Sequence, residues 1–202
     1  MKRLFLLLLA LTVGAETISA AGRAAEILER LAAEFRAMPD YGVDFAIEAG
    51  DYRAEGDYAV QGADYTLKLG DAEVYCDGKV RYEVDNERRE VTIAEVDTTS
   101  RNLLNNPVRA FDFLGDDYRA ELLSEAAGRA VIRLRPVAAE DASAAGSITV
   151  TVNTASMHPV QLDYDYDGEQ VRVVIRRVER LTESLVRFDA ERFKGYEFID
   201  FR

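Results

Sequence analysis

The sequence predicts a mainly β (α+β) protein whose centre is an antiparallel meander of about eleven strands. A ladder of short runs begins near Tyr41, and in each run apolar residues alternate with polar or small ones, as at Val43, Phe45 and Ile47. Turn signals separate the runs at intervals of about 8–12 residues, and Asp77-Gly78 is the sharpest of them. Strands with this pattern form a sheet with one buried face.

The first twenty residues have the composition of a secretory signal. Lys2 and Arg3 precede an apolar run of about ten residues, and small residues follow it before Gly22. The run is too short to span a bilayer, which takes about 20 residues. We therefore expect residues 1–20 to be a signal peptide and residues 21–202 to be a single exported, soluble domain of the periplasm.

Residues 22–38 are expected to form an amphipathic helix. Ile27, Leu31 and Phe35 recur at four-residue steps and so share one face. Pro39 ends the helix, because proline cannot continue its hydrogen-bond ladder. A helix with such an apolar stripe needs an apolar surface to pack on.

The expected strands form two groups separated by residues 98–117. Within that break, Asn106-Pro107 combines a capping residue with proline at the first helical position, so a short helix should cover one side of the sheet there. Residues 191–202 are expected to form a turn and a last short strand. The other expected strands are 43–47, 58–60, 65–69, 80–84, 91–93, 118–122, 130–134, 148–152, 162–166 and 171–175.

Charge and cysteine content narrow the class of protein. The chain has 25 Lys plus Arg and 37 Asp plus Glu, a net charge of −12, which argues against nucleic acid and anionic membrane surfaces as partners. Cys76 is the single cysteine, so no internal disulfide can form, and we interpret it as a packing residue. The expected cleavage point is followed by Ala21 and Gly22 rather than cysteine, which predicts a protein without a lipid anchor.

Catalytic and metal-binding patterns are weak in this chain. His158 is the single histidine and lies in a predicted turn, so a zinc site rich in histidine is excluded. Residues 163–168 resemble the start of a calcium loop, but Val174 stands where that loop needs a bidentate glutamate, which favours a strand and hairpin. We expect no enzyme, no cofactor and no metal; a hydrolase using a pair of carboxylates is an alternative.

The apolar residues of the ladder and of the two helices are expected to face one side. A curved sheet of about eleven strands encloses more volume than small side chains fill, so these residues would line a cavity. For any single residue an ordinary core position is the alternative. The expected lining residues are Leu31, Phe35, Phe45, Ile47, Tyr58, Tyr65, Leu67, Tyr82, Val91, Ile93, Phe111, Leu114, Leu122, Ile132, Leu134, Val150, Leu162, Tyr164, Val173 and Ile175.

Several short motifs occur in a recognisable order: signal, helix, strand meander, helical break and second meander. They are Gly56-Asp57-Tyr58, the run 77–84, Asn106-Pro107, Met157-His158-Pro159 and the ending 195–200. In this order the chain resembles a divergent member of the periplasmic outer-membrane lipoprotein carrier family (LolA-like). The resemblance implies an unclosed antiparallel β-barrel with a lid of short helices, which shields the acyl chains of lipoproteins on their way between two membranes.

The resemblance also implies partners. These are acyl chains of lipoproteins or other lipids, an inner-membrane lipoprotein-releasing transporter and an outer-membrane acceptor, bound by a monomer. In better-known members an arginine in an Arg-Pro stretch helps to latch the lid, whereas this chain has Ala63-Asp64-Tyr65 in that neighbourhood and no tryptophan. An alternative is a lipid-sensing regulatory module of the cell envelope that binds a membrane protein.

Overall fold

The computed structural model describes residues 20–98, 100, 102–112, 118–137, 146–166 and 168–202. The expected signal peptide, except its last residue, therefore lies outside the described residues. Within them the chain forms one α-helix, two short 3₁₀ helices and a single sheet of twelve strands. The fold class expected from the sequence, mainly β with added helices, is confirmed.

The first six strands follow one another with short connections, whereas residues 96–117 separate the sixth strand from the seventh. The helical elements are α1 (Ala20–Arg36), η1 (Pro107–Arg109) and η2 (Ala190–Phe193). The strands are β1 (Asp40–Ala49), β2 (Tyr52–Gln61), β3 (Asp64–Leu69), β4 (Ala72–Cys76), β5 (Val80–Asp85), β6 (Glu90–Glu95), β7 (Tyr118–Ala126), β8 (Arg129–Pro136), β9 (Ile148–Asn153), β10 (Pro159–Tyr166), β11 (Glu169–Arg180) and β12 (Glu197–Asp200).

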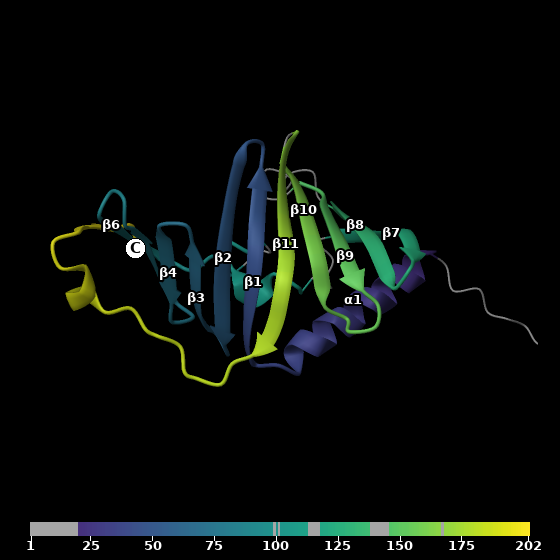
Figure 1. Cartoon of the computed structure of the whole chain (residues 1–202), viewed down its shortest axis with the longest axis horizontal. Helices are drawn as coiled ribbons and strands as arrows, with labels where there is room; N and C mark the ends of the chain where they lie inside the picture. Colours follow the sequence, from purple (N-terminus) through teal and green to yellow (C-terminus); the bar gives the residue numbers. More distant parts are fainter. Residues whose placement is uncertain (1–19, 99, 101, 113–117, 138–145, 167) are drawn as a thin grey trace, which may run out of the picture.

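The sheet is open. Its strand order is β12-β6-β5-β4-β3-β2-β1-β11-β10-β9-β8-β7, so β12 and β7 are its two edges and do not pair with each other. Every described pairing is antiparallel except that of β12 with β6, which is parallel. Figure 1 shows α1 running from the β7 edge to the base of β1, while the C-terminal segment follows the other half of the sheet. This is the unclosed, partly covered barrel that the family resemblance implies.

Two helical expectations need correction. The first helix spans Ala20–Arg36 rather than 22–38, and Pro39 follows after two turn residues. Within the described residues of the mid-chain break, the expected helix is represented by the three-residue η1, and the Asn106 side chain makes no capping bond at its start. The Asn106 side-chain amide instead donates to the carbonyl of Asp97, 3.0 Å away, so the residue ties the preceding loop together.

The twelfth strand, β4, is absent from the alternating runs of the sequence. Its residues Val74, Tyr75 and Cys76 are buried in succession, because both faces of the strand are covered. A strand that is apolar on both faces has no alternation to detect. The last short strand expected in residues 191–202 is confirmed as β12.

Two apolar clusters lie on opposite faces of the sheet. The main cluster contains α1, the loop around η1 and strands β1–β4 and β7–β11, and includes Val74 and Cys76 of β4. The smaller cluster contains Tyr75 together with β5, β6 and Phe193 of η2. Successive residues of a strand point to opposite faces, so β4 contributes to both. The main cluster forms the inner face on which the candidate site is built.

Candidate functional site

The inner face is formed by most of the residues that the sequence places along an apolar cavity. They come from α1, from the segment around η1 and from strands on both halves of the sheet. They are Leu31, Phe35, Phe45, Ile47, Tyr58, Tyr65, Leu67, Phe111, Ile132, Leu134, Val150, Leu162, Tyr164, Val173 and Ile175, with Leu122 partly buried against them. In the described state these side chains pack against one another and against α1, so the interior is filled.

Three of the expected lining residues lie elsewhere. Tyr82 pairs with Tyr75 across β4 and β5, and Ile93 and Val91 continue the same face on β6, in the smaller cluster. The expectation that all apolar residues share one face is therefore wrong for these strands. Alternation shows which residues of a strand share a face, but a strand can turn that face to either side of the sheet. Leu114 lies outside the described residues.

Residues 102–112, here called the lid segment, cover the inner face together with α1. Leu103, Ala110 and Phe111 of this segment are buried in the main cluster. Phe111 packs against Phe35 of α1, with ring centroids 4.3 Å apart. The lid segment and the helix therefore form a continuous apolar cover over the sheet.

Tyrosine hydroxyls of the sheet hold the lid segment by its backbone. Tyr65 donates to the carbonyl of Asn105 at 3.1 Å and Tyr41 to that of Pro107 at 3.5 Å. The hydroxyl of Tyr164 accepts from the amide of Leu103 at 3.4 Å. Burial raises the pKa of Tyr41 and of Tyr65, so both hydroxyls keep their protons and remain donors.

Arg81 of β5 adds a charged contact to the same segment. Its guanidinium donates to the carbonyl of Leu104 at 3.0 Å and forms an ion pair with Glu83. Sequence reasoning missed both Arg81 and Tyr41. Tyr41 shares the apolar parity of Val43 and Phe45 and was detectable on that ground. Arg81 carried no signal, because charged residues on an alternating strand are expected to face water.

Two buried polar groups without a partner lie at the contact between lid segment and sheet, and a third lies on β2. Among the described residues, the buried side-chain atoms with no hydrogen-bond partner are Tyr58 Oη, Asn106 Oδ1 and Arg81 Nε. Asn106 belongs to the lid segment, Arg81 bonds to it, and Tyr58 neighbours Tyr41. An unpaired buried polar group costs about 1–3 kcal/mol. The closed lid is therefore less favourable than its apolar packing alone suggests.

A groove opens where the end of α1, the start of β1 and the lid segment meet. Its volume is about 410 Å³, within the range of roughly 300–1,000 Å³ typical of pockets for one small ligand. Two guanidinium groups and one carboxylate stand among otherwise apolar walls. The groove is lined by Ala32, Phe35, Arg36, Met38, Pro39, Tyr41, Val60, Gly62, Val108, Arg109, Phe111 and Asp112.

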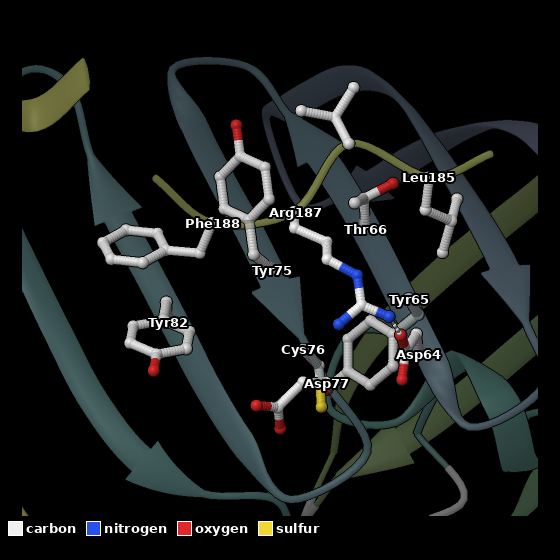
Figure 2. Close-up of a pocket in the computed structure, with 11 residues that line it drawn as sticks. Asp64, Tyr65, Thr66, Tyr75, Cys76, Asp77, Tyr82, Leu185, Arg187 and Phe188 are labelled. Atoms are coloured by element: carbon white, nitrogen blue, oxygen red, sulfur yellow. Dashed lines mark hydrogen bonds and ion pairs between the residues drawn. The ribbon is translucent and has the colours of Figure 1, made fainter. Parts of the chain in front are cut away.

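A second cavity of about 150 Å³ lies between β3–β5 and residues 185–188 of the C-terminal segment. Figure 2 shows Phe188 facing Tyr82 and Arg187 reaching Asp64. The two rings stack with centroids 4.1 Å apart, and the ion pair between Arg187 and Asp64 is 2.8 Å long. These contacts attach the C-terminal segment to the sheet and leave little room for a ligand.

The weak chemical motifs have structural roles. Cys76 is free and buried in the main cluster, as expected for a packing residue. Asp163 pairs with Arg172 on the neighbouring strand at 2.8 Å, in a hairpin rather than a calcium loop. His158 lies in the turn between β9 and β10. In the described part of the chain, no group of three or more His, Cys, Asp or Glu residues could hold a metal ion.

Fold and site together define a class of protein: an open antiparallel half-barrel with a helix-covered apolar interior. No family model matches the chain, and no curated protein matches it. An uncharacterised conserved protein of Thermus thermophilus has a similar structure, with a TM-score of 0.55, 9% identity and coverage of 88% of this chain and 99% of that one.

Two other structures are similar at lower TM-scores. The LolA superfamily protein NE2245 of Nitrosomonas europaea has a TM-score of 0.42 and 12% identity, covering 80% of this chain and 94% of that one. A chain of the Pseudomonas aeruginosa MucA/MucB complex has a TM-score of 0.40 and 12% identity, covering 86% of this chain and 61% of that one. At such identities the likeness concerns the fold.

The described residues also bear on membrane insertion. None of their helices combines the length and the hydrophobicity that a bilayer crossing requires.

Proposed function

We propose that this chain is a periplasmic carrier that shields the acyl chains of lipoproteins, or of other lipids, in its apolar interior and moves them from the inner to the outer membrane. The observation that carries the proposal is the groove of about 410 Å³, which leads between α1 and the lid segment to an inner face made of apolar side chains. A binding protein of this kind needs no catalytic group.

The energetics of lipid transfer explain the need for such a protein. Burying lipid contributes about 0.8 kcal/mol per methylene, so one sixteen-carbon chain holds its owner in a membrane by roughly 12 kcal/mol. Transfer through water without a carrier is therefore very slow. An apolar inner face offers the chain dispersion contacts and few hydrogen bonds, which permits both uptake and release.

Cargo has to displace the cover, because the described interior is filled by its own side chains. Two features support a movable cover. The lid segment is held to the sheet by hydrogen bonds that Tyr41, Tyr65 and Arg81 donate and by one that Tyr164 accepts. The same contact contains unpaired polar groups that penalise closure. The described state is then the closed form.

The remaining parts of the proposal concern the cell. Residues 1–20 direct export, the mature domain 21–202 stays free of a lipid anchor, and it works as a monomer. An inner-membrane lipoprotein-releasing transporter loads it and an outer-membrane acceptor unloads it. These steps rest on the sequence of residues 1–20 and on the family resemblance.

Uptake of a fluorescent fatty-acyl compound by the purified protein tests the proposal, together with native mass spectrometry of protein taken from the periplasm. Val108→Glu places a carboxylate in the wall of the groove and should abolish uptake. Val137→Glu is the matched control, since Val137 is 47% exposed and outside the groove. Absence of bound lipid and of uptake would refute the carrier. Stable co-purification with an inner-membrane protein, without lipid uptake, would favour the regulatory alternative.

A further inference from the structure

Tyr58 is a buried tyrosine whose hydroxyl the closed fold does not use. Its side chain is 1% exposed, and its Oη atom has no hydrogen-bond partner. It stands on β2, opposite Val43 of β1 and Leu67 of β3. Its ring lies 6.0 Å from that of Phe45 and 6.2 Å from that of Tyr41, centroid to centroid. The hydroxyl is therefore enclosed by the apolar inner face.

The other tyrosines of the inner face differ from Tyr58 in the hydrogen bonds that their hydroxyls make. Tyr41, Tyr65 and Tyr164 each bond through the hydroxyl to the backbone of the lid segment. Tyr58 shares their cluster but lacks such a bond. Phenylalanine would pack at this position without the cost of an unpaired buried hydroxyl, and nearly all buried polar groups in proteins are paired. The hydroxyl of Tyr58 is thus available to a group that the free protein does not contain.

The surroundings define which group fits. Burial raises the pKa of Tyr58, and the neighbouring Tyr41 and Tyr164 raise it further, so the hydroxyl is neutral and can donate. The rings recorded beside it, those of Phe45 and Tyr41, carry no charge, so a carboxylate would find no charged counterpart among them. An uncharged carbonyl oxygen accepts a hydrogen bond and needs no donor partner of its own.

We propose that the hydroxyl of Tyr58 donates a hydrogen bond to the carbonyl oxygen of an ester- or amide-linked acyl chain held on the inner face. The inference rests on the proposed carrier function and deepens it. The carbonyl is the polar group that marks the head of an acyl chain, so this bond sets how far the chain enters. It also distinguishes acyl lipids from alkyl lipids of equal length.

The test uses two lipids that differ in this carbonyl alone, 1-hexadecanoylglycerol and 1-O-hexadecylglycerol. Each lipid is used below its own critical micelle concentration, and its displacement of a fluorescent fatty-acyl compound from the protein is measured. The native chain should bind the ester about two- to tenfold more tightly than the ether, the value of one net hydrogen bond. Tyr58→Phe should bind both lipids equally, with the affinity of the native chain for the ether.

Tyr65→Phe is the matched control, because it removes a hydroxyl that already has a partner in the lid segment. It should keep the preference for the ester and melt at a lower temperature than the native chain. Tyr58→Phe should melt at the same or a higher temperature. A retained ester preference in Tyr58→Phe overturns the assignment. Equal binding of both lipids by the native chain also overturns it but leaves the carrier intact, whereas binding of neither lipid removes the carrier function itself.

Discussion

Gly56 on β2 is a position where a single added methyl group should disturb the inner face. A Cβ atom placed there would lie 2.6 Å from the carbonyl oxygen of Lys68 and 2.6 Å from Cζ of Phe45. Phe45 is 1% exposed, so its ring has no free space to enter, and the Lys68 oxygen belongs to the paired strand β3. Inserting a group into a well-packed core costs about 1–3 kcal/mol. We expect Gly56→Ala to lower the free energy of unfolding by that amount.

Gly42 on β1 provides the control for this substitution. A Cβ atom there would meet Cδ2 of Leu181 at 3.4 Å and the carbonyl oxygen of Tyr58 at 3.7 Å, which are ordinary contacts. Gly42→Ala should be neutral or stabilising by up to about 1 kcal/mol, because alanine loses less backbone entropy than glycine. Urea unfolding followed by circular dichroism gives both values. Equal stability of the two variants would contradict the packing described around Phe45.

Three further predictions concern the lid segment, the carboxylate of Glu73 on β4 and the thiol of Cys76. Tyr65→Phe removes one hydrogen bond to the lid segment and should lower the free energy of unfolding by about 1 kcal/mol. Hydrogen exchange in the lid segment and acyl uptake should both become faster. Unchanged exchange would contradict the role of this bond in holding the lid segment. Burial acts to raise the pKa of Glu73, but hydrogen bonds from Tyr75 and Asn86 outweigh it, and the net pKa is lowered. Stability from the ionised carboxylate is therefore present above the unfolded pKa and is lost as the pH falls through the lower folded pKa. Urea midpoints measured down to about pH 3 should show this loss of stability. The Glu73→Gln variant should lack this contribution to the pH dependence. Cys76 should react slowly with a thiol reagent until the protein is unfolded, because it is 7% exposed and burial raises its pKa; rapid reaction of the folded protein would argue against its packing.

Local sequence patterns predicted most of the strands correctly, because alternation at a period of two reports directly on a half-buried strand. Alternation does not mark β4, where Val74 and Tyr75 are buried on opposite faces. The patterns also assigned Tyr82, Val91 and Ile93 to the inner face. Each of these strands alternates as expected, but the side that its apolar residues face depends on the rest of the chain, here on Phe188 and on Phe193 of the C-terminal segment.

The candidate site shows the same division. Apolar residues of the inner face were predictable, since the hydrophobic effect acts on composition and spacing. The hydrogen bonds that hold the lid segment were not. They join Tyr65 to Asn105 and Tyr164 to Leu103, pairs that are 40 and 61 residues apart in the chain. No local pattern carries information about such contacts.

By itself, the sequence determined that this protein is mainly β, with a meander of half-buried strands that follows an amphipathic helix. Those properties follow from local periodicity and from the residue types present. The tertiary structure alone decided that β12 joins β6 in parallel and that four interior side chains hold the lid segment. It also left the hydroxyl of Tyr58 without a partner. Pairings between distant segments form only once the whole chain has folded, because each depends on where the other elements already lie.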